Sequence, residues 1–337
     1  MSTVVCLPSR GEAMLIDCAH APSTLRWLER EKINRLRFVI ATHSDGDHIA
    51  GIAIVIRNFK GTIDYVLYHP DGRRVRDRQQ AYRQLLQAVE THRLSGHPAS
   101  TGCDTLLAKL PLEICRILYP TWERLQLNLE QSGEPNRSSA AVYFEKAGYG
   151  FLISGDLEAD GWSHLRDEKG LPRSHVFLLP HHGGEFRVRT YVPRQRALGS
   201  AVAEPAMTSA ELLHRVAPTI AVISSGSSAK SGFPPQPSVL ASIRRYASGA
   251  SGFRLLCTEI SRHCVTDPLE HRDRALTCLL PENCEGRCRL EREHSPCAGT
   301  VVITISASGR LDVSPEAKQH NEVVRGLEHA QCRSGAR

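Results

Sequence analysis

The sequence predicts a layered α/β fold, an α/β sandwich. Short apolar runs that suit buried strands alternate along the chain with segments whose apolar residues keep helical spacing. Three of the apolar runs end directly in side chains that bind divalent metals, and layered α/β folds assemble their sites at the carboxyl ends of strands. Together these observations favour a sandwich with a metal site at one edge of its sheets.

One domain is the simplest organisation of this chain. We find no internal repeat and no shift in composition sharp enough for a boundary within the 337 residues. We therefore predict a single domain over residues 1–337, with a Cys-rich insertion at about 257–298 and a C-terminal hairpin plus helix at 299–337.

Apolar runs bounded by turn residues predict the strands. They are expected at residues 3–8, 13–17, 38–41, 65–68, 112–118, 140–144, 151–153, 176–179, 219–224 and 253–258. A closing hairpin is expected at 300–308 and 311–313. Helical spacing of apolar residues predicts helices at 25–33, 79–94, 239–246 and 321–330. The first of these helices has Ser23 or Thr24 as its expected N-cap.

Composition and charge exclude few classes of function. The formal net charge of +6 permits a nucleic-acid partner without requiring one. No apolar run is long enough for a membrane span, and the first residues do not form a signal peptide. We therefore expect a cytoplasmic protein without a membrane partner.

The most informative stretch is the turn at residues 42–48, directly after the apolar run 38–41. It holds two imidazoles and two carboxylates within six residues, from His43, Asp45, Asp47 and His48. Neutral imidazoles and ionised carboxylates both bind divalent metals. The small residues Ser44 and Gly46 let the chain turn sharply enough for these side chains to converge. The alternative is a helix cap with incidental histidines, which would gather four ligand-type side chains by chance. We interpret the stretch as a metal site on a strand-to-helix turn.

Two later strands end in the same way. The apolar run 151–153 leads to Ser154-Gly155-Asp156, and the run 176–179 leads to Pro180-His181-His182-Gly183. Asp156, His181 and His182 are therefore further candidate metal ligands.

In this order, His-x-Asp-x-Asp-His, Ser-Gly-Asp and Pro-His-His-Gly resemble the metallo-β-lactamase fold superfamily. The resemblance is closest to the metallohydrolase domain of ComEC-type competence proteins and extends to about residue 260. Stretches that support it lie at residues 15–18, 136–139 and 221–224.

The resemblance implies an αββα sandwich that holds two divalent metal ions, Zn²⁺ or Mn²⁺, with Mg²⁺ also tolerated by its carboxylates. It implies that His43 and Asp45 bind one metal, that Asp47 and His48 bind the other, and that Asp156 bridges them. His181 or His182 then completes the second set. The resemblance also implies that Asp47 orients the attacking water and that one of the two histidines protonates the leaving group.

The chain departs from the wider superfamily at three places. Asp45 stands where that superfamily usually has histidine, as it does in the competence branch. No histidine lies between His97 and Asp156, so Asn136, Ser138 or water is expected at the mid-chain ligand position. Gly232-Phe233-Pro234 replaces a Gly-His-Pro that relatives often carry.

Residues 187–198 hold four arginines with no clear period. We interpret this segment as a basic loop beside the metal site, with Arg187 and Arg189 as substrate-binding candidates together with Asn136 and Ser138. A solvated insertion is an equally good interpretation.

Six of the eleven cysteines fall in the polar segment 257–297, which is too polar to build a core of its own. A structural zinc ion would cross-link it, with candidate ligands Cys264, Cys284, Cys288 and Cys297. Only Cys284-x-x-x-Cys288 has tight ligand spacing, so free thiols in a loop remain the alternative.

The leading hypothesis for function is a metal-dependent phosphodiesterase, a nuclease whose substrate is DNA. A second hypothesis keeps the metal site and changes the substrate to a β-lactam, lactone, thioester or small phosphoester. A third is a binding module whose site is degenerate. The metal site follows from the chain's own residues, whereas the DNA substrate follows from the resemblance.

Overall fold

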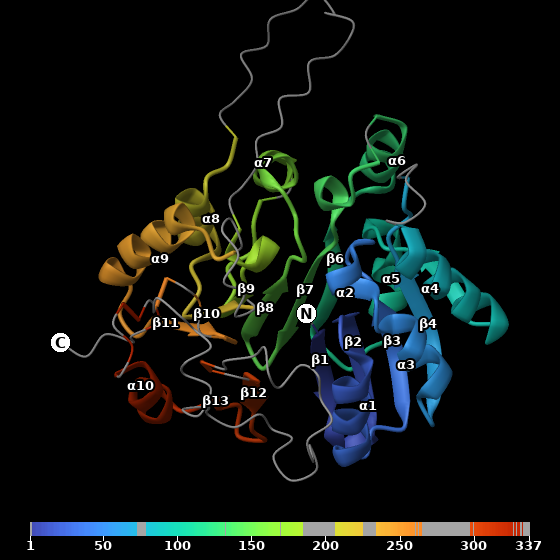
Figure 1. Ribbon diagram of the computed structural model, residues 1–337, viewed down its shortest axis with the longest axis horizontal. Coiled ribbons are helices and arrows are strands. Elements are labelled where there is room, and N and C mark those ends of the chain that lie inside the picture. Colours follow the sequence, from blue (N-terminus) through green and yellow to red (C-terminus); the bar gives the residue numbers. More distant parts are fainter. Residues whose placement is uncertain are drawn as a thin grey trace, which may run out of the picture.

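The computed structural model of the protein describes residues 2–72, 79–131, 133–168, 170–184, 206–224, 234–259, 261, 263–264, 297–298, 300–325, 327, 329–330 and 332. Its elements form four layers, in which two sheets lie face to face and helices cover both outer faces (Figure 1). This arrangement is the predicted αββα sandwich.

The first sheet has the strand order β1-β2-β3-β4-β5. β1 pairs antiparallel with β2, and the other neighbouring pairs are parallel. The strands are β1 (Ser2–Leu7), β2 (Glu12–Cys18), β3 (Arg35–Ile40), β4 (Thr62–Tyr68) and β5 (Ser95–Pro98). The parallel strands β2 and β3 therefore end at the same edge of the sheet.

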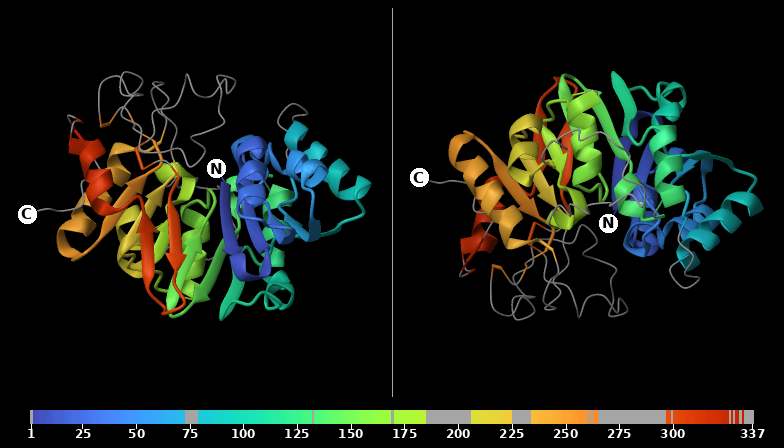
Figure 2. Two further views of the ribbon diagram at one scale, coloured as in Figure 1. Left: turned by 90° about the horizontal axis from the view of Figure 1, so that it is seen from below. Right: turned by 90° about the horizontal axis from the view of Figure 1, so that it is seen from above.

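The second sheet has the order β11-β10-β9-β8-β7-β6. β6, β7 and β8 are antiparallel neighbours, whereas β8 to β11 run parallel. The strands are β6 (Ile114–Tyr119), β7 (Ala141–Lys146), β8 (Tyr149–Ile153), β9 (Val176–Leu178), β10 (Ile220–Ile223) and β11 (Arg254–Cys257). The hairpin of β12 (Val302–Ile305) and β13 (Leu311–Ser314) packs against the apolar layer between the sheets (Figure 2).

Helices cover the outer faces of the two sheets (Figure 2). They are α1 (Ala21–Arg30), α2 (Gly46–Ile49), α3 (Ile52–Asn58), α4 (Gln80–Thr91), α5 (Asp104–Leu107), α6 (Trp122–Gln131), α7 (Ala159–Glu168), α8 (Ser209–Val216), α9 (Pro237–Gly249) and α10 (Ala317–Arg325). None of the helices in the described ranges is long and apolar enough to cross a membrane.

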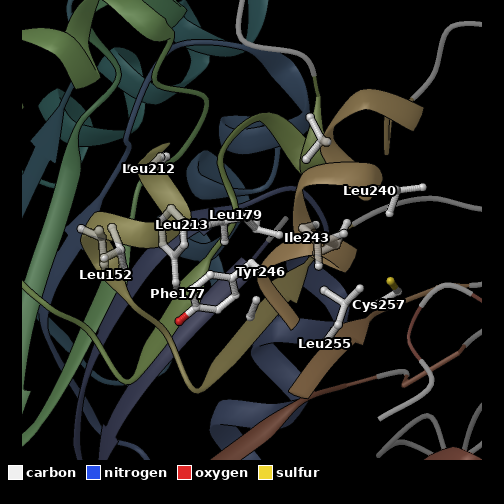
Figure 3. Packing of buried hydrophobic residues seen from close by; sticks show 14 of the residues in the cluster. Leu152, Phe177, Leu179, Leu212, Leu213, Leu240, Ile243, Tyr246, Leu255 and Cys257 are labelled. Atoms are coloured by element: carbon white, nitrogen blue, oxygen red, sulfur yellow. The ribbon is translucent and has the colours of Figure 1, made fainter. Parts of the chain in front are cut away.

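Three apolar clusters separate the four layers, because successive side chains of a strand point to opposite faces. Ile16 and Phe38 of the first sheet meet strands of the second sheet in the middle cluster. Their neighbours Leu15 and Val39 instead pack in the cluster that holds α1, α3 and α4. In the third cluster, Phe177 of the second sheet packs with the outer helices α8 and α9 (Figure 3).

The predicted strands agree with the structure within a few residues, but several helices differ. α1 begins at Ala21 rather than at residue 25, with Pro22 in its first turn, where a missing N–H costs nothing. Neither Ser23 nor Thr24 is its cap, since both lie inside the helix. The final helix is α10, which begins and ends earlier than the predicted 321–330. The helices α5 to α8 were not predicted.

Candidate metal centre

The turn after β3 begins the site. His43 and Ser44 are buried, Asp45 precedes the short helix α2, and Asp47 and His48 lie within that helix. The backbone carbonyl of Thr42 accepts a hydrogen bond of 2.7 Å from the Ala140 N–H, which joins this turn to the second sheet. The turn is therefore held between the two sheets and is not a loose surface loop.

Two strands of the second sheet bring the remaining candidate ligands. Asp156 follows β8, and Gly155 before it has a φ of +49°. A Cβ on Gly155 would lie 2.4 Å from the hydroxyl of Ser139, so only glycine allows this approach. His181 and His182 follow β9 with φ values of +52° and +55°, a left-handed conformation that is uncommon for non-glycine residues.

A first group of ligand atoms surrounds the Nε2 atom of His43. It lies 3.8 Å from Oδ2 of Asp45 and 3.8 Å from Oδ2 of Asp156. Nε2 of His181 lies 4.0 Å from the same Asp156 oxygen. Oδ2 of Asp156 is therefore the atom that these side chains share.

A second group faces the other oxygen of Asp156. Nε2 of His48 lies 3.1 Å from Oδ1 of Asp156 and 3.2 Å from Nε2 of His182. Nε2 of His182 in turn lies 3.2 Å from Oδ2 of Asp47. His182 thus belongs with Asp47 and His48, and each oxygen of Asp156 faces a different group.

The Nδ1 atoms of the histidines are fixed by other partners. Nδ1 of His48 lies 2.8 Å from Oδ2 of Asp17, and Nδ1 of His182 lies 2.5 Å from the carbonyl oxygen of Ser224. Both acceptors favour the tautomer with hydrogen on Nδ1, which leaves the Nε2 lone pair for a metal. Asp17 also accepts hydrogen bonds of 2.8 Å from the N–H and from the hydroxyl of Thr42.

In the metal-free site, the neighbouring charges act differently on the two buried histidines of the turn. Burial, followed by the nearby charge of His48, lowers the pKa of His43 to about 3, so its imidazole is neutral at pH 7. Burial acts to lower the pKa of His48 as well, but the carboxylates of Asp156 and Asp17 outweigh it and raise that pKa to about 10. Burial opposes ionisation of Asp156, yet the charges of His48 and His43 hold its pKa well below its usual value.

The donor set fits divalent metal ions. Nε2 of His43 is buried and makes no hydrogen bond to any atom of the residues that the structure describes, a costly state that a bound cation would relieve. His43, His48 and Asp156 form one cluster of metal-ligand atoms, and Asp47, His48 and His182 form a second. Imidazoles with carboxylates are suitable for Zn²⁺ and Mn²⁺.

The expected substrate-binding residues have a different placement. Ser138 is fully buried, and its hydroxyl lies 2.7 Å from both Nε2 of His69 and Nδ2 of Asn128. Both contacts occupy the Ser138 hydroxyl inside the protein, and its role as a substrate-binding or mid-chain ligand residue stays a prediction. The backbone carbonyl of Asn136 accepts hydrogen bonds from the N–H groups of Ser139 and Glu158. Arg187 and Arg189 lie outside the described residues.

The predicted structural zinc ligands are only partly described. Cys284 and Cys288 lie outside the described residues. Cys264 and Cys297 are buried in the same apolar cluster beside β11.

Sequence reasoning missed the residues that hold the ligands in place. Asp17, Thr42 and Ser139 are fully buried around the centre, and the hydroxyl of Ser139 accepts a hydrogen bond of 3.1 Å from the N–H of Asp156. One signal was available for Asp17, since it also ends a buried strand with a carboxylate. Nothing local marks Thr42 or Ser139.

The comparison with protein families agrees with the fold. The model of the metallo-β-lactamase superfamily matches residues 1–185. No curated protein matches the chain. Among solved structures, the crystal structure of human tRNase Z, short form, is similar at 12% sequence identity with a TM-score of 0.34, over 77% of this chain and 85% of that chain.

Proposed function

The chain belongs to the metallo-β-lactamase superfamily, and we propose that it is a metal-dependent phosphodiesterase, a nuclease that cleaves DNA through two divalent metal ions. The observation that carries this proposal is the position of Asp156 between two groups of ligand atoms. Oδ2 of Asp156 faces His43, and its Oδ1 faces His48. A carboxylate shared in this way suits a centre of two adjacent ions.

Each group would hold one ion. His43 and Asp45 with Oδ2 of Asp156 form the first set, and Asp47, His48 and His182 with Oδ1 of Asp156 form the second. Three carboxylates make the combined site rich in hard oxygen ligands. We therefore propose Zn²⁺ or Mn²⁺ as the native ions, with Mg²⁺ tolerated.

Two adjacent divalent ions, when bound, stabilise the attacking and leaving oxygens of a displacement at phosphorus and lower the pKa of a water. The chain's own groups then handle the protons. Asp47 is partly open to solvent, with 63% of its side chain exposed, so it can contact and orient an incoming water. Neighbouring side chains partly desolvate the Asp47 carboxylate, which acts to raise its pKa, but the contact with His182 and the charge of His48 lower that pKa below its usual range, so the group stays ionised.

His181 is the proposed proton donor to the leaving group. His182 is fixed through Nδ1 by Ser224, and its Nε2 lies among the second set of ligand atoms. The side chain of His181 is more exposed than that of His182, at 24% against 16%. It therefore has more freedom to reach a leaving oxygen.

The proposed substrate follows from charge and from the resemblance to ComEC-type competence proteins. The net charge of +6 favours a polyanion, and Arg187 and Arg189 follow His182 closely in the sequence. We propose that these two arginines contact phosphates of the DNA. A double variant with both arginines changed to alanine should weaken DNA binding and reduce its dependence on salt, while hydrolysis of a small phosphodiester is retained.

The decisive assay uses the purified full chain with single-stranded DNA, double-stranded DNA, a small chromogenic phosphodiester and nitrocefin, each with Zn²⁺, Mn²⁺ or Mg²⁺. We expect DNA cleavage that Asp156→Ala and Asp47→Ala abolish. The matched control is Asp167→Ala on α7, because Asp167 is exposed and pairs with the neighbouring Arg166.

Other outcomes would overturn the proposal. Hydrolysis of nitrocefin alone would show that the substrate is a small molecule. DNA cleavage that survives in Asp156→Ala would reveal a contaminating nuclease. No hydrolysis with any metal, despite metal binding, would show that the chain is a binding module.

A further inference from the structure

A second group of metal-ligand side chains lies apart from the centre described above, where the C-terminal segments meet β11. Cys297, His320 and Cys332 form it, and each is at most 1% exposed. His320 comes from α10, and Cys332 lies beyond that helix. Cys257, at the end of β11 and 4% exposed, lies beside them in the same apolar cluster, at the edge shown in Figure 3.

The ligand atoms of Cys297, His320 and Cys332 are spaced like three corners of a tetrahedron. Sγ of Cys297 lies 3.3 Å from Nε2 of His320 and 3.5 Å from Sγ of Cys332, and the last edge, from Cys332 to His320, is 3.5 Å. Bond lengths of about 2.3 Å to sulfur and about 2.0 Å to nitrogen place ligand atoms of tetrahedral zinc roughly 3.5–3.8 Å apart. The observed spacing leaves room for an ion of this size with little movement.

A fourth sulfur completes the set. The thiol of Cys257 lies close to Cys332, which together with burial raises the pKa of Cys257 well above its usual value. The backbone fixes its neighbour Cys297, because the N–H of Cys297 donates to the carbonyl of Thr258 at 3.1 Å and the N–H of Ala298 donates to the carbonyl of Cys257 at 2.8 Å. Cys257 and Cys297 are thus held side by side by strand-like pairing, whether or not an ion is bound.

Other interpretations of this cluster account for less. Buried thiols often act as small apolar side chains, but that does not explain an imidazole whose Nε2 faces two sulfur atoms inside an apolar core. A disulfide would need sulfur atoms about 2.05 Å apart, and these cysteines are all free. Cys264 is also buried nearby, and its Sγ lies 3.7 Å from the hydroxyl of Ser261.

We propose that Cys257, Cys297, His320 and Cys332 bind one structural zinc ion in a closed tetrahedral site. Thiolates and imidazole select zinc among the common divalent ions, and four protein ligands leave no open position for a substrate. The ion joins the end of the second sheet to α10 and to the tail after it. This site differs from the predicted set of Cys264, Cys284, Cys288 and Cys297, with which it shares only Cys297.

The proposal does not depend on the proposed function, and a spectroscopic test separates the two sites. The full chain is loaded with Co²⁺ in place of zinc, and the thiolate-to-cobalt charge-transfer band is recorded. The centre around Asp156 offers only nitrogen and oxygen ligands among the described residues, so the band reports the cysteine site alone. We expect the band in the native chain and in Asp156→Ala.

Substitution of the ligands tests the assignment. Cys297→Ser and Cys332→Ser should each lose most of the charge-transfer intensity. Metal analysis of each variant should find about one zinc ion per chain fewer than in the native protein. The matched control is Cys115→Ser on β6, a buried free cysteine in another apolar cluster, which should keep both. Cys332→Ser also guards against misfolding, because it changes a residue beyond the last helix and leaves β11 intact.

Three outcomes would overturn the proposal. One is a native chain that, loaded with cobalt, shows no charge-transfer band. Another is that Cys257→Ala keeps both the charge-transfer band and the zinc, whereas Cys264→Ala loses both. That result would reject Cys257 as the fourth ligand. The third is an intact mass, for the metal-free chain purified without reductant, that is two hydrogens below the mass expected for free thiols. If the Cys332→Ser variant does not show this deficit, Cys332 forms a disulfide instead of binding zinc.

Discussion

Asp17 provides the sharpest test of how the metal centre is built, because it touches no metal in the proposed arrangement. Its carboxylate accepts from Nδ1 of His48 and from the N–H and hydroxyl of Thr42, each at 2.8 Å. The perturbation is Asp17→Asn. Asparagine is nearly isosteric and tolerates the φ of +55° at this position, so the backbone is not strained. Only the charge and one acceptor are lost.

The size of the effect follows from the hydrogen bonds. The asparagine oxygen can still accept from the N–H of Thr42, but its NH₂ group then faces Nδ1 of His48. Nδ1 must become an acceptor, which moves the hydrogen to Nε2 and removes the lone pair that would bind the metal. Loss of such a supporting contact typically costs roughly 10- to 100-fold in metal affinity, or about 1.4–2.8 kcal/mol.

The assay is a competition titration of the full chain against a chromophoric zinc chelator. Asp104→Asn is the matched control, since the carboxylate of Asp104 also accepts from a backbone N–H, that of Ile117 on β6, at 3.0 Å. We expect Asp17→Asn to bind zinc at least about tenfold more weakly, and Asp104→Asn to bind it as the native chain does. Equal affinity in the native chain and Asp17→Asn would refute the reasoning.

Further predictions concern a close contact and the protons of the metal-free site. Gly155→Ala places a Cβ 2.4 Å from the hydroxyl of Ser139 at a φ of +49°, so thermal unfolding should show a loss of about 2–4 kcal/mol. Gly148→Ala, with a φ of +75° and open space, should cost only about 1 kcal/mol, and equal losses in the two variants would contradict the contact argument. Because the pKa of His48 is raised to about 10 without metal, zinc binding at pH 8 should release a proton from its imidazole. Calorimetry in several buffers would detect this release as a binding enthalpy that varies with the ionisation enthalpy of the buffer. A binding enthalpy that does not vary would show that His48 is already neutral. The same raised pKa means that His48 adds its full contribution to the stability of the metal-free chain below about pH 6.5, and that this contribution is lost as the pH rises through about 10. The lowered pKa of His43 acts in the opposite direction. Its contribution to stability is present above about pH 6.5 and is lost as the pH falls towards 3. Thermal melts of chelator-treated His48→Asn and native chains should therefore converge at high pH, and a constant difference would reject this linkage.

The two proposed metal sites differ in the way their ligands are spaced. In the turn after β3, four candidate ligands fall within six residues, directly after a buried strand, so the local pattern is enough to predict a site. At the C-terminal site, Cys297 and His320 are 23 residues apart, and Cys332 follows 12 residues later. No short motif marks such a set, because its members come from different elements that only packing brings together.

Helix α6 shows a similar limit for the fold. Its leucines at positions 125, 127 and 129 alternate with polar residues, a period of two that is typical of a strand. In the structure Leu125 is buried, whereas Leu127 is 39% exposed and Trp122 is 43% exposed. The burial of Leu125 therefore favours a helix here, although the local pattern is typical of a strand.

The sequence by itself determined the layered fold, its buried strands, and the side chains from His43 to His182 that gather at the strand ends. These features depend on periodicity and on neighbours in the chain, which a sequence displays directly. The tertiary structure alone decided that His182 joins Asp47 and His48, that Asp17 fixes His48, and that Cys297 meets His320 and Cys332. Those contacts arise because parallel strands bring their ends to one edge and because the C-terminal segments pack against β11, and neither fact is written in any local stretch of residues.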